Sequence, residues 1–238
     1  LQCPAKFYFS KVLRLEERGD VLSGIDAAET GNILHRVMEL LYRPFVGKNG
    51  LRYDYLEHSL RGVLDEIFEQ RVEEVRGEQY LLREMMFKRI KKYLDREREW
   101  FKDTHRVVAT ECELSWDVDV RLKGRIDRVD NYGDDYLIID YKSGNIDNYA
   151  FKCFDRILGS RMEMKKWAAS LQLPCYVLLY KGANPAIPYN RINSCIISLQ
   201  SNTEKMLFGD EKIDRGVFLR DIFLPTLKNL VCEIMDAR

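Results

Sequence analysis

The sequence predicts an α/β fold: a small mixed, mostly antiparallel sheet flanked by helices, with a helical N-terminal half. Apolar residues recur at helical spacing over the first hundred residues, the period then falls to two, and helical spacing returns near the C-terminal end. The chain has 238 residues, of which 46% are hydrophobic, so it can bury one sizeable core. We therefore expect a single domain over residues 1–238, with a helical insertion at about residues 50–104.

Helical spacing predicts four helices in the N-terminal half. One is expected at about Pro4–Leu15. A second starts near Thr30, carries apolar residues on one stripe and ends before Pro44. Two longer helices are expected at Leu56–Val75 and Tyr80–Phe101.

The sheet and the C-terminal helices follow. Alternating β-branched and aromatic residues predict strands at Val107–Trp116, Val120–Asp130, Tyr136–Tyr141 and Asn193–Leu199. A helix is expected at about Arg161–Lys181, interrupted or bent near Pro174. The last 25 residues, from Asp214, return to helical spacing with a break at Pro225.

Charge and cysteine content exclude several classes of protein. Lys+Arg and Asp+Glu balance at 38 each, so affinity for nucleic acid needs a local basic surface, expected between Lys142 and Lys181. The six cysteines form no Cys-x2-Cys pair, which argues against a zinc ribbon, and a chain of this size needs no disulfides. No apolar run approaches ~20 residues, so we expect no membrane span and a cytoplasmic location. Because no Met begins the chain, we expect an excised piece of a longer protein.

The sharpest feature is a predicted hairpin that carries two aspartates. A two-residue turn at Gly133-Asp134 is a strong hairpin signal. Its register places Asp127 directly opposite Asp140, with Cβ atoms ~5 Å apart. Lys142, two residues further on, points to the same face as Asp140. The same register places Arg125 opposite Lys142. Either the register slips at the strand end, or a substrate phosphate lies there, which makes Arg125 a candidate substrate-binding residue.

Two opposed carboxylates destabilise a sheet unless positive charge lies between them. A divalent cation is the simplest such charge, and carboxylate ligands favour Mg²⁺, with Mn²⁺ as a substitute. Such an ion polarises a phosphoryl oxygen and acidifies water, while Lys142 can orient that water or neutralise charge on the phosphate. We therefore predict that Asp127, Asp140 and Lys142 are catalytic. The plain alternative is solvated acidic residues at a strand end; the apolar residues before Asp140 argue against it.

Four motifs in order resemble the RecB-like branch of the PD-(D/E)XK nuclease superfamily: Gly31-Asn-Ile-Leu-His35, Gly124-Arg-Ile-Asp127, Asp140-Tyr141-Lys142 and Gln172-Leu-Pro-Cys-Tyr176. The opening Cys3-Pro-Ala-Lys-Phe-Tyr-Phe resembles the start of the nuclease domain in AddB-like helicase–nuclease subunits. The resemblance spans residues 3–176 and implies a restriction-endonuclease-like core. It also implies an Mg²⁺-dependent deoxyribonuclease, expected to be an exonuclease in double-strand break repair, with DNA and helicase domains or a helicase subunit as partners.

The resemblance also implies roles for single residues. The metal would be held by His35, Asp127, Asp140 and the backbone carbonyl of Tyr141, and Lys142 would serve the nucleophilic water. Gln172 and Tyr176 would contact substrate or the catalytic strand, and Glu111 matches an acidic position often seen before the first aspartate. Each has a simpler reading from the residues alone: His35 as an interior side chain, Gln172 with Tyr176 as an ordinary helix pair, and Glu111 as a strand-face charge.

The cysteines depart from the family pattern. Many AddB-like and CRISPR-associated relatives hold an iron–sulfur cluster with one cysteine near the start and three near the end. Cys3 is in place, but the C-terminal segment offers only Cys232, so we expect no cluster. A non-enzymatic alternative is an inactive scaffold for DNA guidance or subunit contact; intact Asp127, Asp140 and Lys142 favour the enzyme. Hydrolysis of another kind of phosphodiester stays open.

Overall fold

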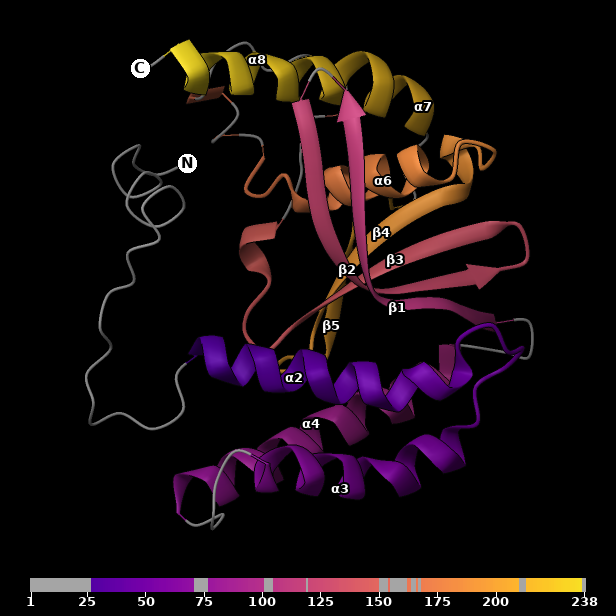
Figure 1. The fold of residues 1–238 in the computed structure, drawn as a ribbon, viewed down its shortest axis with the longest axis vertical. Coiled ribbons are helices and arrows are strands. Elements are labelled where there is room, and N and C mark those ends of the chain that lie inside the picture. Colours follow the sequence, from indigo (N-terminus) through magenta and orange to yellow (C-terminus); the bar gives the residue numbers. More distant parts are fainter. Residues whose placement is uncertain are drawn as a thin grey trace.

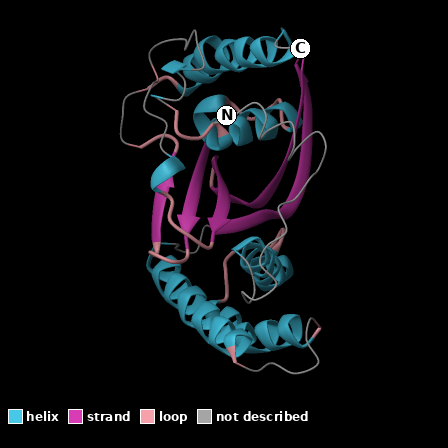
Figure 2. Cartoon of the chain, turned by 90° about the vertical axis from the view of Figure 1, so that its left-hand side faces the viewer, coloured by secondary structure: helices cyan, strands magenta, loops and turns pink. Residues whose placement is uncertain are grey.

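A five-stranded sheet lies at the centre of the computed structural model, with helices on both of its faces (Figures 1 and 2). The structure describes residues 27–70, 77–100, 105–118, 120–149, 154, 162–163, 166, 168–209 and 213–236. The helix expected at Pro4–Leu15 lies outside these residues. Within them, no helix combines the length and the apolar character needed to cross a bilayer.

Three helices form the layer on one face of the sheet: α2 (Ala27–Tyr42), α3 (Tyr53–Glu69) and α4 (Glu78–Trp100). They confirm the three predicted helices that fall within the described residues. After α2 the chain passes into a short 3₁₀ turn that contains Pro44, because proline has no N–H to continue an α-helix. The apolar stripes of these helices pack against one another and against β3 and β4 in one core cluster.

The sheet has the order β1 (His105–Val118), β2 (Val120–Tyr132), β3 (Asp135–Lys142), β4 (Ile192–Ser198) and β5 (Thr203–Met206). Only β3 and β4 run parallel; the other neighbours are antiparallel. This mixed sheet flanked by helices confirms the predicted restriction-endonuclease-like architecture. The sequence did not predict β5, because this short strand at the sheet edge carries charged residues in place of an apolar alternation.

The helices on the other face are α6 (Gln172–Ala183), α7 (Arg215–Val217) and α8 (Leu224–Asp236). The described residues Met162, Glu163 and Lys166 are helical, but residues 168–171 are not, so the helix expected at Arg161–Lys181 is interrupted just before α6. Pro174 lies in the first turn of α6, where N–H groups have no helical partner, so it bends nothing. The chain also stays helical across Pro225. A π-helical segment, Phe218–Phe223, precedes α8 and adjusts the hydrogen-bond pattern ahead of the proline.

Candidate functional site

β2 and β3 form the predicted hairpin, but their ladder ends just before the two aspartates. Gly133 in the turn has a φ of 66°. From this turn the two strands pair in the predicted register, and the last pair is Arg128 with Ile139. At the next position, Oδ2 of Asp127 accepts a hydrogen bond of 2.7 Å from the backbone N–H of Tyr141. A side chain therefore replaces the backbone ladder where direct opposition of the aspartates was expected.

The end of this ladder also settles the position of Arg125. Arg125 pairs with Glu113 on β1, and the β2–β3 pairing stops before it would meet Lys142. The expected juxtaposition of these two cations is therefore absent, because the pairing ends in the predicted register and does not slip. The Arg125 guanidinium instead makes an ion pair with Glu111.

Seven of the predicted site residues line one cavity of about 560 Å³: His35 from α2, Arg125 and Asp127 from β2, Asp140 and Lys142 from β3, and Gln172 and Tyr176 from α6. Glu111 from β1 also lines it. The eighth predicted residue, Tyr141, has its side chain buried outside this cavity, although its backbone N–H holds Asp127. Elements far apart in the sequence thus meet at one place.

His35, Glu111 and Asp127 form the tightest group of possible metal ligands in the described part of the chain. One ligand atom of each lies within 4.8 Å of the others. Nδ1 of His35 is 3.0 Å from Oδ1 of Asp127 and 3.9 Å from Oε1 of Glu111. One imidazole and two carboxylates are a donor set that suits a divalent cation.

The backbone at Glu111 is unusual. Its φ is 50°, in the left-handed region that non-glycine residues seldom adopt. In the β1–β2 ladder Thr110 pairs with Arg128, and Cys112 pairs with Ile126. Glu111 and Asp127, which lie between these two pairs, are not paired with each other. Both strands therefore depart from regular pairing at the same level, where their carboxylates approach His35. Such local strain is often found at functional sites.

Asp140 is held from two sides by neighbouring side chains. Its Oδ1 accepts hydrogen bonds from Nε2 of Gln172 at 2.8 Å and from the hydroxyl of Tyr176 at 2.9 Å. Its Oδ2 lies 2.6 Å from Nζ of Lys142. Asp140 lies in the same cavity but outside the close group formed by His35, Glu111 and Asp127. Gln172 and Tyr176 contact each other as a helix pair and also hold Asp140 on β3.

Burial and repulsion between neighbouring carboxylates shift pKa values in the site. Burial raises the pKa of Asp140, and the charge of Asp127 raises it further, while Lys142 offsets only part of this. Burial and Asp127 likewise raise the pKa of Glu111. Burial alone would lower the pKa of His35, but its hydrogen bond to Asp127 and the surrounding carboxylates raise it overall. A bound cation would relieve the repulsion that these shifts express.

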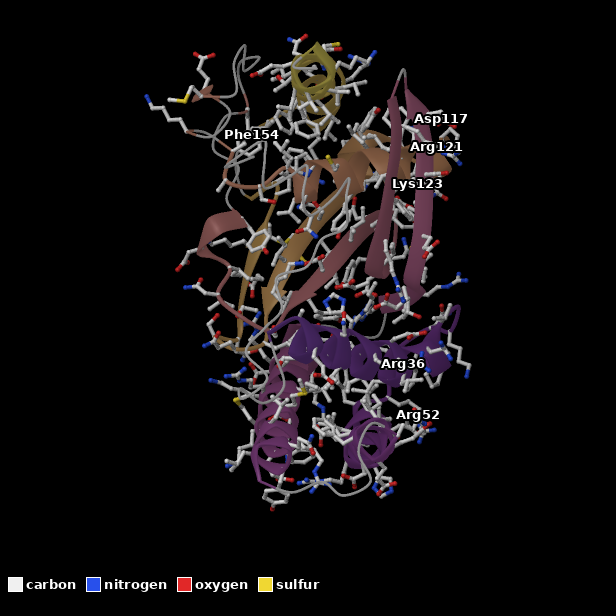
Figure 3. All side chains as sticks on the ribbon, turned by 60° about the vertical axis from the view of Figure 1, so that its left-hand side comes forward. Arg36, Arg52, Asp117, Arg121, Lys123 and Phe154 are labelled. Atoms are coloured by element: carbon white, nitrogen blue, oxygen red, sulfur yellow. The ribbon has the colours of Figure 1, made fainter. Side chains whose placement is uncertain are left out.

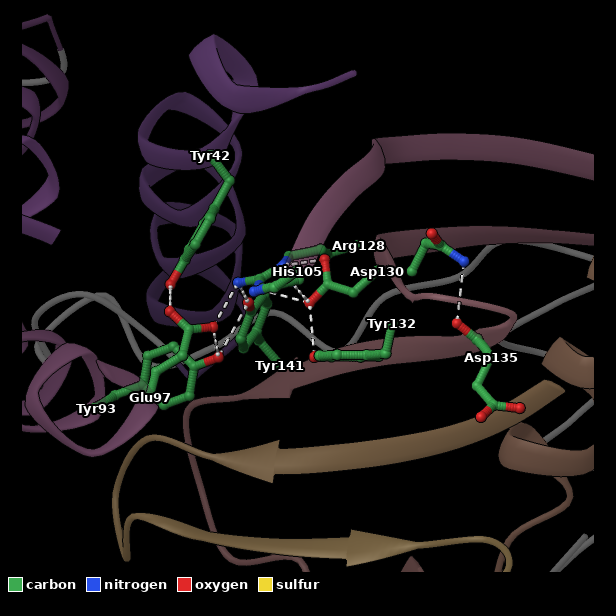
Figure 4. Close-up of polar contacts among 10 residues, drawn as sticks. Tyr42, Tyr93, Glu97, His105, Arg128, Asp130, Tyr132, Asp135 and Tyr141 are labelled. Carbon is green, nitrogen blue, oxygen red and sulfur yellow. Dashed lines mark hydrogen bonds and ion pairs between the residues drawn. The ribbon is translucent and has the colours of Figure 1, made fainter. Parts of the chain in front are cut away.

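Behind the cavity lies a second charged cluster, which we call the buried network (Figure 4). Its centre is Arg128, which is 1% exposed and whose guanidinium lies over the ring of Tyr42. Nη1 of Arg128 lies 2.8 Å from Oε1 of Glu97, and its Nε donates to Oδ1 of Asp130 at 2.7 Å. Tyr93, His105, Tyr132 and Tyr141 complete the network. It joins the helical layer to β2 and β3 directly beside Asp127 and Asp140.

Sequence reasoning did not identify the buried network. In the sequence Glu97 lies in a strongly charged helical stretch, which normally faces solvent. The one available signal was that Arg128 and Asp130 occupy the same alternating positions of the strand as the apolar Leu122 and Ile126.

Other expectations meet the limits of the described residues. Cys3 and four of the seven basic residues of the expected basic stretch between Lys142 and Lys181 lie outside them. Cys232 is exposed on α8.

Comparisons with known proteins agree with this geometry. The family model of the PD-(D/E)XK nuclease superfamily matches residues 1–231. The chain is also similar to an ATP-dependent helicase/deoxyribonuclease subunit of Clostridium novyi (strain NT), with 26% identity over 96% of this chain. The alignment covers 24% of that relative, so the chain spans about a quarter of its length. Since the family model covers nearly the whole sequence, the chain belongs to the PD-(D/E)XK nuclease superfamily.

Proposed function

We propose that this chain is a divalent-metal-dependent deoxyribonuclease, using Mg²⁺ or, as a substitute, Mn²⁺, and cutting as an exonuclease. The observation that carries the proposal is the convergence of His35, Glu111 and Asp127 with the Asp140–Lys142 pair in one cavity. Superfamily membership supports a nuclease, and the name of the relative supports DNA as the substrate.

In the proposed site, His35 and Asp127 hold the cation together with Glu111, Asp140 and the backbone carbonyl of Tyr141. The cation would supply Lewis-acid polarisation of the scissile phosphate and acidify the attacking water. Lys142, beside Asp140, orients that water and neutralises charge that develops on the phosphate.

The remaining side chains position this machinery. Gln172 and Tyr176 fix the Asp140 carboxylate through their hydrogen bonds, so its orientation does not depend on the ligand. Arg125, which is 59% exposed at the cavity rim, is placed to contact a phosphate of the substrate.

The wider setting is part of the proposal. We infer a single nuclease domain, with α3 and α4 as a helical insertion, within a cytoplasmic helicase–nuclease used in double-strand break repair. Its partners would be DNA and the helicase domains or helicase subunit of the parent protein. An inactive scaffold is the competing function, and it predicts no metal-dependent cleavage.

The test is cleavage of end-labelled single-stranded and duplex DNA with Mg²⁺, Mn²⁺ or EDTA. Asp127→Asn and Asp140→Asn should each lower the rate by at least about a thousandfold, because each removes a carboxylate that serves the cation. Asp95→Asn, an exposed position on α4, is the matched control. A closed circular DNA that resists cutting would support the exonuclease. Wild-type activity in either site variant would refute the mechanism, and an inactive wild type would favour the scaffold.

A further inference from the structure

The β1–β2 hairpin carries a row of exposed cations that ends at the site cavity. Arg121, Lys123 and Arg125 alternate along β2 and are all exposed, while Leu122 and Gly124 between them are partly covered. Alternate residues of a strand point to one face and lie ~6.8 Å apart. The three cations therefore form a straight row on one face, which we call the hairpin row, and its last member lies two residues before Asp127.

Packing on the opposite face fixes the direction in which this row points. Leu122 and Ile126 pack into the core cluster that includes α6. A Cβ added at Gly124 would meet the side chain of Leu179 at 2.7 Å, so α6 approaches the strand backbone closely there. The hairpin row consequently faces away from α6. In Figure 3 the labelled Asp117, Arg121 and Lys123 descend along the hairpin toward α2, which carries Arg36.

The row is continuous with the candidate active site. A hollow of about 450 Å³ along the hairpin is lined by residues that include Arg121, Lys123 and Arg125. Arg125 also lines the site cavity, so the two hollows share one wall. A strand that leaves the cavity beside Arg125 would run directly onto Lys123 and Arg121.

The charges along the row are unequally compensated. Arg121 lies opposite Asp117, with Nε 3.7 Å from a carboxylate oxygen, and Arg125 is paired with Glu111. Lys123 lies opposite Ser115, and it makes no ion pair with any residue that the structure describes. Lys123 is thus the member of the row whose charge is most available to an external anion.

We propose that the hairpin row binds the phosphate backbone of the DNA strand being cut, on the stretch adjoining the scissile phosphate. This inference rests on the proposed function and adds Lys123 and Arg121 to it. The chain has no net charge, so binding of a polyanion needs a local row of this kind. The exposed residues of the two strands here, Glu113, Ser115, Asp117, Arg121, Lys123 and Arg125, include no aromatic side chain on which a base could stack, so the row contacts the backbone and not the bases.

The test measures binding of a long single-stranded oligonucleotide in EDTA, which prevents metal-dependent cleavage. Arg121→Ala with Lys123→Ala should weaken binding about three- to tenfold, and the slope of log affinity against log salt should become shallower by ~0.7 for each phosphate that is no longer neutralised. The matched control removes two exposed cations from α4, Lys91→Ala with Lys92→Ala, and should leave affinity and slope at the wild-type values.

A second measurement separates this inference from the proposed function. The ratio of metal-dependent activity on the long strand to activity on a small nitrophenyl phosphodiester should fall in the hairpin variant, because only the long substrate reaches the row. Equal binding and equal slopes in the hairpin and α4 variants would overturn the inference while leaving cleavage by the wild type intact. A parallel loss on both substrates would also overturn it, since it would mean that the row acts through the fold. A wild type that cleaves neither substrate would refute the proposed function itself.

Discussion

β2 and β3 build two charged regions from neighbouring residues, and these regions balance their charges in opposite ways. Asp127 and Asp140 face the site cavity, whereas Arg128 and Tyr141, the next residues along the chain, enter the buried network. In the network, burial would raise the pKa of Asp130, but the charge and hydrogen bonds of Arg128 and His105 lower it overall. In the cavity, burial and neighbouring carboxylates raise the pKa of Asp140.

This contrast separates a cluster whose charges are paired within the protein from one whose carboxylates are only partly paired. The buried network pairs each of its carboxylates with Arg128 within the protein. The cavity brings more carboxylate charge together than its own cations compensate, so it gains most from an ion supplied from outside. The network also ties α2 and α4 to the strands through Tyr42 and Glu97, which gives the site a rigid support.

The largest effect on stability is expected from the network. Arg128→Met should lower the free energy of unfolding by about 3–5 kcal/mol, because it leaves Glu97 and Asp130 buried without a counter-charge. Arg61→Met, which removes an ion pair on the helical surface, is the matched control and should cost far less. Denaturant unfolding measures both. A small decrease in the Arg128 variant would mean that the network does not hold the two layers together.

Substitution of Lys142 in the cavity is expected to act mainly on activity. Lys142→Ala is expected to slow DNA cleavage about a hundredfold, because the phosphate loses a positive charge and the water loses its orienting group. Binding of Mn²⁺, followed by calorimetry, should persist because Lys142 is not a ligand. If metal binding disappears with the side chain, Lys142 acts by holding Asp140 in place and its proposed role is wrong.

Periodicity predicted most of the fold, and where it failed the cause was local. Three predicted helices and three predicted strands before residue 143 match α2, α3, α4, β1, β2 and β3. Within the described residues their bounds agree to within a few residues. Thr203–Met206 was missed because an edge strand needs no apolar face. The helix expected at Arg161–Lys181 is broken at residues 168–171, since helical spacing alone does not show where a chain leaves the helix.

The site was predictable in composition but not in detail. The turn at Gly133 set the hairpin register, and the order of motifs placed His35 with the aspartates. No local signal in the sequence showed that Glu111 would adopt a left-handed conformation or that the ladder would end before Asp127. These features depend on how three elements meet, and pairing rules within one hairpin do not describe that.

Metal binding offers a sharper test of Glu111. With Mn²⁺ at about a hundred times its Kd, the wild type should gain roughly 2.7 kcal/mol in the free energy of unfolding. Glu111→Gln should show a clearly smaller gain if this carboxylate is a ligand, whereas Glu113→Gln, the exposed neighbour on the same strand, should match the wild type. If Mn²⁺ stabilises the wild type and both variants equally, Glu111 is not a ligand and is a strand-face charge paired with Arg125.

The smallest expected effect is a pH dependence of opposite sign in the two regions. The pKa of Asp140 is raised above its ordinary value of 3.8, so the folded protein binds that proton more tightly than the unfolded chain. The favourable contribution of Asp140 to stability is present below pH 3.8 and is lost as pH rises through the raised pKa. The pKa of Asp130 is lowered, so its contribution is present above 3.8 and is lost as pH falls through the lowered pKa.

In metal-free protein, Asp140→Asn should therefore raise the free energy of unfolding at neutral pH, by on the order of 1 kcal/mol. The gain should shrink as pH falls toward 3.8, because Asp140 becomes neutral there in the wild type as well. Asp130→Asn should do the reverse. It should lower the free energy of unfolding at neutral pH, and its difference from the wild type should shrink as the solution is acidified. Denaturant unfolding in EDTA from neutral pH to below 3.8 measures both variants, because the contribution of Asp130 changes only below 3.8. If Asp140→Asn destabilises the metal-free protein at neutral pH, the hydrogen bonds from Gln172 and Tyr176 and the Lys142 contact outweigh the repulsion, and the cavity is as well balanced as the network.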